Sequence, residues 1–219
     1  EAVAVNSGTS ALHLACRALG VGEGDTVWTS PITFVASANC ARYCGADVDF
    51  VDIDPHTYNM SPSALEAKLE QAESEGNLPK AIIPVHMCGQ PCDMQAIQEL
   101  SKRYGFYIIE DACHALGGRY QNEPVSNCRY SDITVFSFHP VKIITTAEGG
   151  MAVTNNFDLA QKMDLLRSHG ITRNPELFAD VQHSKDDDQD WTSNLGQQTS
   201  NIEHRTSNVE PPAWYYEQI

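Results

Sequence analysis

The feature of this sequence that most constrains its fold is an alternation of short, β-branched apolar runs with amphipathic segments. Such an alternation is typical of α/β proteins, in which helices cover a mainly parallel sheet. The continuous apolar character of the runs predicts strands that are buried on both faces. We therefore predict an α/β domain with a mainly parallel, seven-stranded sheet and helices on both faces. The predicted strands are residues 2–5, 26–30, 47–53, 81–86, 106–111, 132–138 and 150–155.

The segments between these runs begin and end with residues that are typical of helix termini. In "SPSALEAKLEQAESEG", Ser61 can cap a helix, Pro62 stands at its first position and Gly76 can end it. Similar signals predict helices elsewhere along the chain. These other predicted helices are residues 93–105, residues 156–170 and a segment that ends at Gly20.

The composition favours one compact, acidic domain that acts on small molecules. The chain has 219 residues, of which 42% are hydrophobic, and this is ample for one core. Lys and Arg total 14 against 29 for Asp and Glu, so the formal net charge of -15 disfavours nucleic acid and anionic membranes as partners. No apolar run approaches the ~20 residues of a membrane span, and no signal-like segment opens the chain. We predict a soluble, cytoplasmic protein.

The periodic pattern ends after about Arg173 and gives way to a polar stretch with an acidic cluster at residues 186–188. We predict that residues 174–219 form a long loop or a partly disordered insertion, separate from the domain of residues 1–173, with an ordered lid as the alternative. The chain starts at Glu1 without an initiator Met and ends in an aromatic stretch, "AWYYEQI". We therefore expect it to be a fragment of a larger protein.

Seven cysteines are spread over apolar segments without the paired two-residue spacings of zinc sites. Two pairs are spaced by four residues, which is weak support for a redox or metal site. We predict reduced, structural thiols and no bound metal. The cysteines are Cys16, Cys40, Cys44, Cys88, Cys92, Cys113 and Cys128.

Three predicted strand ends carry polar side chains, and open α/β sheets bind ligands at the carboxyl ends of their strands. The first is "VNSGTSALHLACRALG", in which a small-residue turn separates strand 2–5 from a helix. The backbone N–H groups of this turn and the Thr9 and Ser10 hydroxyls can bind one phosphate, helped by the helix dipole. A plain helix N-cap is the alternative. The spacing matches neither the P-loop nor the GxGxxG fingerprint, which disfavours ATP and NAD.

The second strand end is "YIIEDACHALGG", where Glu110 and Asp111 end an apolar strand and His114 follows. Because side chains alternate across a strand, only one carboxylate of the pair faces a given pocket. That carboxylate can bind a metal, or it can pair with a cationic ring nitrogen of a heterocycle. A carboxylate that caps the following turn is the alternative for either residue.

The third strand end is "FSFHPVK", residues 136–142, which "IITTAEGG" follows. Pro140 cannot continue a sheet ladder, so Lys142 lies in an irregular loop between two strands. Such a lysine is usually a solvated surface charge, but a loop between apolar strands can also partly desolvate the amine and make it a nucleophile. A phosphate cradle, a carboxylate for a ring nitrogen and a nucleophilic lysine are together the groups that hold pyridoxal 5'-phosphate (PLP).

These stretches resemble the DegT/DnrJ/EryC1/StrS family of PLP-dependent sugar aminotransferases. The resemblance is carried by "NSGTSALHLA", "SPITFVASAN", "AIIPVHMCGQPCDM", "IIEDACHALGG", "FSFHPVK" and "TAEGGMAVT", and it returns at "AWYYEQ". It implies the type I aminotransferase fold, with residues 1–173 as an N-terminally truncated, PLP-binding large domain. Residues 174–219 would be an acidic insertion and the start of the connection to a small carboxyl-terminal domain that this chain lacks.

The resemblance also implies roles for single residues. Lys142 would bind the PLP aldehyde and then move a proton at the substrate α carbon, and Asp111 would keep the pyridine nitrogen protonated. Phe34 would lie against the ring, and His114 would contact it. For Glu148, stabilisation of the loop and contact with substrate are equally open. The residues implied at the phosphate or beside it are Thr9, Ser10 and Ser137.

Within the family, "FHPVKIITTAEGG", "RSHGITR" and "EPPAWYYEQ" are most similar to transaminases of the pseudaminic acid pathway. This similarity implies that a homodimer transfers an amino group from L-glutamate to UDP-2-acetamido-2,6-dideoxy-beta-L-arabino-hex-4-ulose. Lys142 implies amine transfer, because dehydrating relatives carry histidine at that position. The alternatives are another sugar aminotransferase of the family, such as a perosamine synthase, a non-catalytic relative that keeps the fold, and a nicotinamide-dependent oxidoreductase.

Overall fold

The computed structural model describes residues 1–171 of the 219-residue chain. Glu1–Asp164 form one compact unit, and Leu165–Ile219 are assigned to a second, of which only residues 165–171 are described. The polar stretch of residues 174–219 lies outside the described residues, so the domain boundary at residue 173 stays a prediction. No helix in the described part of the chain is long and apolar enough to cross a membrane.

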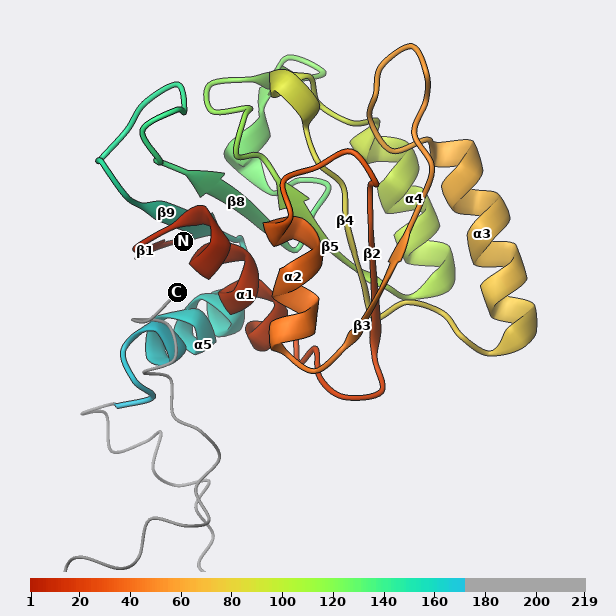
Figure 1. Cartoon of the computed structure of the whole chain (residues 1–219), viewed down its shortest axis with the longest axis horizontal. Coiled ribbons are helices and arrows are strands. Elements are labelled where there is room, and N and C mark those ends of the chain that lie inside the picture. The colour runs from red at the N-terminus through yellow and green to blue at the C-terminus, as the bar shows by residue number, and fades with distance from the viewer. Residues whose placement is uncertain (172–219) are drawn as a thin grey trace, which may run out of the picture. The chain divides into compact units, whose positions relative to one another are not determined.

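The first unit is built on a seven-stranded sheet. Its strands are β1 (Ala2–Val5), β2 (Thr26–Thr29), β3 (Asp47–Phe50), β4 (Ala81–Ile83), β5 (Tyr107–Asp111), β8 (Ile133–Ser137) and β9 (Gly150–Val153). The strand order is β1-β9-β8-β5-β4-β2-β3 (Figure 1). Within this sheet only β9 runs antiparallel to its neighbours, β1 and β8, and every other pair is parallel. The mainly parallel, seven-stranded sheet that the sequence predicts is confirmed.

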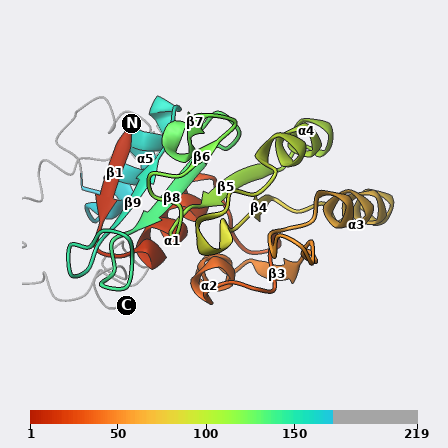
Figure 2. The ribbon, with the colours of Figure 1, turned by 90° about the horizontal axis from the view of Figure 1, so that it is seen from above.

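Helices cover both faces of this sheet, as predicted. They are α1 (Gly8–Ala18), α2 (Ala36–Tyr43), α3 (Pro62–Glu75), α4 (Met94–Tyr104) and α5 (Phe157–Arg167). Helices α1 and α2 pack against each other on one face, and α3 and α4 lie on the opposite side (Figure 2). The two faces therefore have different helical partners, and this decides where each strand side chain points.

The predicted ends of α3 and α4 are confirmed by their capping contacts. Ser61 Oγ accepts a hydrogen bond from the Ala64 N–H, and Asp93 Oδ1 accepts one from the Ala96 N–H. Gly76 follows α3 in the left-handed conformation, with a φ of 71°, and this conformation favours glycine at a helix end. The sequence signals therefore place these two helices within a residue or two.

Helix α2 and the hairpin of β6 (Arg119–Tyr120) and β7 (Glu123–Pro124) were not predicted from the sequence. The residue before α2 is Val35, which has no side-chain capping bond, so no start signal announces this eight-residue helix. Strands β6 and β7 have two residues each, too few for a visible alternation of apolar and polar side chains. Both elements depend on tertiary contacts.

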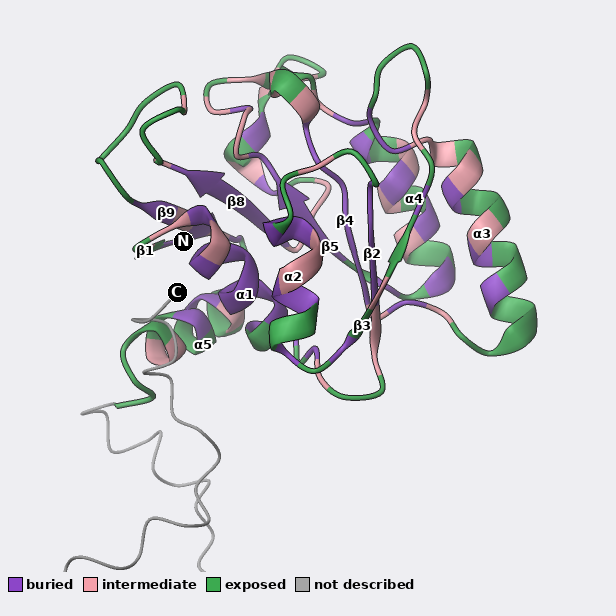
Figure 3. Cartoon of the chain, in the orientation of Figure 1, coloured by how far each residue is buried: buried purple, intermediate pink, exposed green. Residues whose placement is uncertain are grey.

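Burial on both faces is confirmed for β5 and β8 but is wrong for β1 and β3, the two edge strands of the sheet. Strand β3 lies at the edge of the sheet beside β2, and three of its four residues are exposed (Figure 3). Its sequence, "DVDF", places carboxylates on this edge, and charged side chains protect an edge strand against pairing with another chain. The apolar run therefore predicted the strand correctly but not its place in the sheet.

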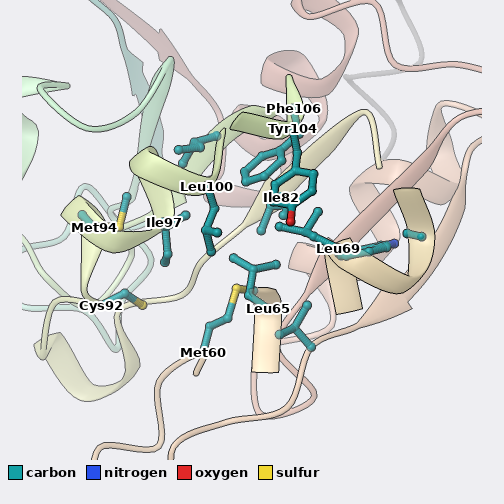
Figure 4. Close-up of a cluster of buried hydrophobic side chains, with 14 residues drawn as sticks. Met60, Leu65, Leu69, Ile82, Cys92, Met94, Ile97, Leu100, Tyr104 and Phe106 are labelled. Carbon is teal, nitrogen blue, oxygen red and sulfur yellow. The ribbon is translucent and has the colours of Figure 1, made fainter. Parts of the chain in front are cut away.

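The larger core cluster fills the space between the sheet and helices α3 and α4 (Figure 4). Trp28, Ile82 and Ile108 stand side by side on β2, β4 and β5, and they contribute the sheet side of this cluster. Leu65 and Leu69 of α3 and the side chains of α4 complete it. Because Ile108 faces α3 and α4, Glu110 of the same strand shares that face, and Asp111 belongs to the face of α1 and α2.

Candidate active site

A cavity of about 250 Å³ opens at the carboxyl ends of the parallel strands. Residues that follow or end β1, β2, β4, β5 and β8 contribute to its wall. The three strand ends singled out in the sequence therefore converge on one place, as expected for an open α/β sheet. The predicted site residues that line the cavity are Thr9, Phe34, Asp111, His114, Ser137 and Lys142.

The N-terminus of α1 forms one end of the cavity. Ser7 is its N-cap, and Ser7 Oγ accepts a hydrogen bond from the Ser10 N–H at 3.1 Å. Gly8 packs closely on β8, because a Cβ atom at this position would lie 2.9 Å from Ser137 Cβ. The first N–H groups of a helix have no partner within the helix, so those of Gly8 and Thr9 can bind an anion here. Ser137, which lines the same wall, adds a hydroxyl.

Ser10 is the predicted site residue that the structure does not bring to the wall of this cavity. Its side chain is buried, and its Oγ donates a hydrogen bond to Asn6 Oδ1 at 2.5 Å. Ser7 lines the cavity instead. The reason is the geometry of the N-cap, which joins the Ser7 and Ser10 hydroxyls at 3.0 Å and turns Ser10 inward. The candidate anion site therefore contains Ser7 in place of Ser10.

Gly150, the first residue of β9, holds the α1 N-terminus against the sheet. A Cβ atom at Gly150 would lie 2.2 Å from the Ser7 carbonyl oxygen and 2.7 Å from the Gly8 nitrogen. No side chain fits at such distances, so only glycine permits this approach. The second glycine of "TAEGG" therefore allows two backbone segments to approach closely.

Asp111 ends β5 and lines the cavity from the face of α1 and α2. Its side chain is nearly buried, with 5% of its surface exposed. Asp111 Oδ2 accepts a hydrogen bond from Ser37 Oγ at 2.7 Å, and Oδ1 accepts one from the Cys113 N–H at 3.2 Å. A carboxylate oxygen has two lone pairs, so both oxygens keep acceptor capacity for a ligand.

Glu110 faces the opposite side of the sheet and does not line the cavity. Its Oε1 lies 2.7 Å from His86 Nε2, and both side chains are buried. Ser131 and Thr134 donate hydrogen bonds to its other oxygen, Oε2. His86 Nδ1 accepts the Cys92 N–H, so the proton of a neutral His86 ring is on Nε2 and points to Glu110. This pair joins the segment after β4 to β5 and β8, and it has a structural role.

Lys142 lies in the loop between β8 and β9, as predicted. Its side chain is half-buried and lines the cavity, and its backbone N–H donates to the His139 carbonyl at 2.9 Å. The loop is closed at its base by the Phe138 N–H, which donates to the Gly149 carbonyl. Glu148 also lines the cavity, and its Oε1 lies 3.8 Å from His139 Nε2. Contacts across the loop thus place the lysine at the end of β8.

His114 and Cys113 follow Asp111 and are neutral groups at the cavity wall. Burial and the positive charge of Lys142 lower the pKa of His114, and Asp111 offsets part of this shift. Burial and the negative charge of Asp111 raise the pKa of the Cys113 thiol well above its ordinary value. Both shifts favour the neutral forms of His114 and Cys113 beside Asp111 and Lys142.

Phe34 contributes an exposed aromatic ring to the cavity wall, with 69% of its surface accessible. Met87 and Val141 add further apolar surface. An accessible ring beside a carboxylate and a lysine can lie against a planar ligand. The cavity therefore has an apolar wall and three polar points: the α1 N-terminus, Asp111 and Lys142.

Sequence reasoning missed Ser37, whose hydroxyl is bonded to Asp111 across 74 positions of the sequence. A signal for it exists, since Thr33 and Ser37 are four residues apart, as two side chains on one face of a helical turn are. In the described residues, no group of three or more His, Cys, Asp or Glu side chains could hold a metal ion. All seven cysteines are free thiols, and of these Cys88 is exposed.

The donor set of the cavity fits pyridoxal 5'-phosphate. This cofactor presents a phosphate, an aldehyde and a pyridine nitrogen, which need an anion site, an amine and an acid. The α1 N-terminus, Lys142 and Asp111 provide these three groups on separate walls.

A mainly parallel sheet with β9 antiparallel beside β8, and a cavity that unites a helix N-terminus, a buried carboxylate and a lysine, define the large domain of a type I PLP-dependent aminotransferase. The chain belongs to the DegT/DnrJ/EryC1/StrS aminotransferase family, whose profile matches residues 1–197. The enzymes of this family use PLP as their cofactor.

Two relatives show how similar the chain is to characterised members of the family. It is 46% identical over 174 residues to GDP-perosamine synthase of Caulobacter vibrioides, covering 80% of this chain and 45% of the relative. It is 47% identical over 174 residues to UDP-4-amino-4,6-dideoxy-N-acetyl-beta-L-altrosamine transaminase of Campylobacter jejuni serotype O:2, covering 79% of this chain and 44% of the relative. The chain thus spans less than half the length of these relatives.

Solved structures of the family have the same fold. A DegT DnrJ EryC1 StrS aminotransferase from Brucella abortus superposes with a TM-score of 0.75 at 34% identity, over 80% of this chain and 47% of that structure. PseC of Helicobacter pylori, an aminotransferase involved in the biosynthesis of pseudoaminic acid, superposes with a TM-score of 0.72 at 37% identity, over 80% and 45%. These matches confirm the fold class predicted from the sequence.

Proposed function

We propose that the protein is a PLP-dependent aminotransferase that acts on a nucleotide-linked 4-keto-6-deoxy sugar, with L-glutamate as the amino donor. The observation that supports this most directly is the convergence of Asp111, Lys142 and the α1 N-terminus on one cavity. The family membership of residues 1–197 supports the class of reaction.

In this proposal, the N–H groups of Gly8 and Thr9 and the hydroxyls of Ser7 and Ser137 hold the phosphate of the cofactor. Asp111 binds the pyridine nitrogen and keeps it protonated, and Lys142 Nζ takes the aldehyde. Phe34 lies against the ring from its exposed position at the wall, and His114 contacts the ring as a neutral imidazole. When bound, PLP withdraws electrons from the substrate carbon that loses a proton.

Lys142 Nζ also moves that proton. With the cofactor bound, the Lys142 amine would act as the base that takes the proton from the α carbon of the amino donor, and then as the acid that returns it on the cofactor side. The Phe138 N–H, which donates to the Gly149 carbonyl, closes the base of the loop that carries this amine. The Asp111 carboxylate would stabilise the positive charge of the protonated ring nitrogen.

For the sugar, we propose UDP-2-acetamido-2,6-dideoxy-beta-L-arabino-hex-4-ulose, an intermediate of pseudaminic acid biosynthesis. The 47% identity to the Campylobacter jejuni transaminase and the likeness to Helicobacter pylori PseC support this substrate. The 46% identity to GDP-perosamine synthase supports a GDP-linked 4-keto sugar nearly as well. The two substrates differ in the nucleotide and in the sugar, and an assay can separate them.

We also propose that the protein works in the cytoplasm as a homodimer. Val141, Ile143 and Ile144 are each more than half exposed beside Lys142, and Phe34 is exposed on the same cavity. A second subunit would cover this apolar surface and keep water from the cavity. Sedimentation of the protein should therefore give a dimer.

Borohydride reduction of the PLP-loaded protein, followed by peptide mapping, tests the proposed site. We expect the adduct on Lys142 and none in the Lys142→Ala variant. An adduct on another lysine would refute the proposal. If ligand binding were unchanged in Lys142→Ala, a non-catalytic relative that keeps the fold would be the better description.

The substrate is tested by supplying L-glutamate with either the UDP-linked or the GDP-linked 4-keto sugar. We expect the 4-amino product with the UDP-linked sugar. Product from the GDP-linked sugar alone would make the protein a perosamine synthase. Binding of a nicotinamide cofactor in a titration would contradict both assignments.

A further inference from the structure

The side chains of Thr33, Ser37 and Asp111 form a hydrogen-bonded row that begins at the cavity wall. Thr33 Oγ1 lies 2.8 Å from Ser37 Oγ, and Ser37 Oγ lies 2.7 Å from Asp111 Oδ2. Thr33 lines the cavity, whereas Ser37 is fully buried in the first turn of α2. The row connects two strand ends, because Thr33 follows β2 and Asp111 ends β5.

The direction of both hydrogen bonds follows because each hydroxyl has only one proton to donate. An ionised carboxylate only accepts hydrogen bonds, so Ser37 donates its single hydroxyl proton to Asp111. Ser37 Oγ then has only lone pairs for Thr33, so Thr33 donates to Ser37. With the Cys113 N–H on Oδ1, each oxygen of the Asp111 carboxylate is fixed by one donor.

These donors act in a buried environment, where their effect on a carboxylate is large. Low local dielectric strengthens a hydrogen bond to a carboxylate. Hydrogen bonds to two different oxygens also prevent rotation of the carboxylate. Serine hydroxyls in helices commonly bond to a carbonyl of their own helix, but that of Ser37 crosses to β5.

We propose that Ser37, oriented by Thr33, is a positioning residue that holds the Asp111 carboxylate aimed at the ring nitrogen of the cofactor. The inference rests on the proposed function, because it concerns how Asp111 meets that nitrogen. Ser37 itself does not line the cavity, so it acts through Asp111.

The test compares binding of PLP with binding of 1-deazapyridoxal 5'-phosphate, in which carbon replaces the ring nitrogen. In Ser37→Ala we expect PLP affinity to fall about tenfold or more, the size of one hydrogen bond to a charged group, and deaza-analogue affinity to stay unchanged. In Thr33→Val, which leaves the Ser37 bond in place, we expect a smaller loss of about threefold for PLP alone. Affinities are measured by absorbance titration of the 219-residue chain.

Ser30→Ala is the matched control. Ser30 is as buried as Ser37, follows β2 like Thr33, and has no hydrogen-bond partner for its hydroxyl among the described residues. The Ser30→Ala substitution should change neither the affinity for PLP nor that for the deaza analogue. A second measurement is the ¹⁵N chemical shift of bound, ring-labelled PLP, which should move toward the unprotonated value in Ser37→Ala.

Each outcome decides between a positioning role and its absence. An equal loss of both affinities in Ser37→Ala would show a merely structural role, and no loss would show that Asp111 does not depend on Ser37; either result overturns the inference and leaves the proposed function standing. If the unmodified chain binds PLP at no site that includes Lys142, the proposed function fails and this inference fails with it. Should Ser37→Ala not fold, the threefold loss expected for Thr33→Val decides.

Discussion

Glu110 and Asp111 are neighbours in β5, and their carboxylates point to opposite faces of the sheet. Asp111 Oδ2 accepts the Ser37 hydroxyl from α2 at 2.7 Å, whereas Glu110 Oε1 lies 2.7 Å from the buried His86 ring behind the sheet. One carboxylate faces the cavity, and the other joins β5 to its neighbours. Substitutions at the two positions should therefore have different effects.

Glu110→Gln should lower the free energy of unfolding by about 1–3 kcal/mol, because His86 loses a charged acceptor in a buried place. Formation of the Lys142 adduct with PLP should persist in the folded protein, because Glu110 does not line the cavity. Urea denaturation measures the first effect and peptide mapping the second. The control is Glu66→Gln, which breaks the exposed Arg103–Glu66 pair and should cost less than about 1 kcal/mol. Equal losses in both variants would contradict the proposed structural role of Glu110.

Gly150→Ala should destabilise the protein by about 1–3 kcal/mol and weaken phosphate binding, because the new Cβ atom would lie 2.2 Å from the Ser7 carbonyl oxygen. The backbone must move, and the N-terminus of α1 moves with it. Thermal unfolding and inorganic phosphate titration measure the two effects. In Gly22→Ala, where a Cβ atom meets nothing within 4 Å, neither quantity should fall. Normal stability of Gly150→Ala would argue against the close packing.

Leu69→Ala should cost about 2–5 kcal/mol, because Leu69 of α3 is fully buried in the cluster between the sheet and helices α3 and α4. Phe157→Ala removes a larger side chain that is 60% exposed, so its cost should stay within about 0.5 kcal/mol. The two free energies of unfolding come from urea titrations under identical conditions. A larger cost for Phe157 would place the core elsewhere.

We expect Tyr120 to make the free energy of unfolding depend on pH in the alkaline range. Burial and the hydrogen bond that its hydroxyl donates to Asp93 raise the pKa of Tyr120 to about 12, above the ordinary value of about 10. Because the pKa is raised in the folded state, the stabilisation that the protonated Tyr120 hydroxyl contributes is complete below about pH 10. It disappears as the pH rises from about 10 to about 12. The difference in unfolding free energy between the wild type and Tyr120→Phe should shrink over that range in urea titrations. A difference that stays constant up to pH 11 would contradict the assignment.

The strands of the seven-stranded sheet could be predicted from the sequence because most of them are short runs rich in apolar and β-branched residues. The ends of α3 and α4 could be predicted because Ser61, Asp93 and the following glycines act locally. Helix α2 and the β6–β7 hairpin were missed because neither has a local signal strong enough to be recognised. The exposure of β3 was missed because a strand's position in a sheet depends on its neighbours.

The candidate site was predicted in outline from three strand ends and a family resemblance. Thr9, Asp111, Ser137 and Lys142 do line one cavity, whereas Ser10 turns inward to Asn6. Ser37 was missed because its partner, Asp111, is far away in sequence. The functional roles of these residues stay proposals until the adduct is mapped.

The sequence by itself determined the alternation of strands and helices, the helix ends, and the kinds of chemical group at each strand end, because these depend on local periodicity and on single side chains. Alternation along β5 even required Glu110 and Asp111 to face opposite sides. Only the tertiary structure decided which of the two meets the cavity. That choice depends on where α1 and α2 pack, and their packing arises from contacts between residues distant in sequence.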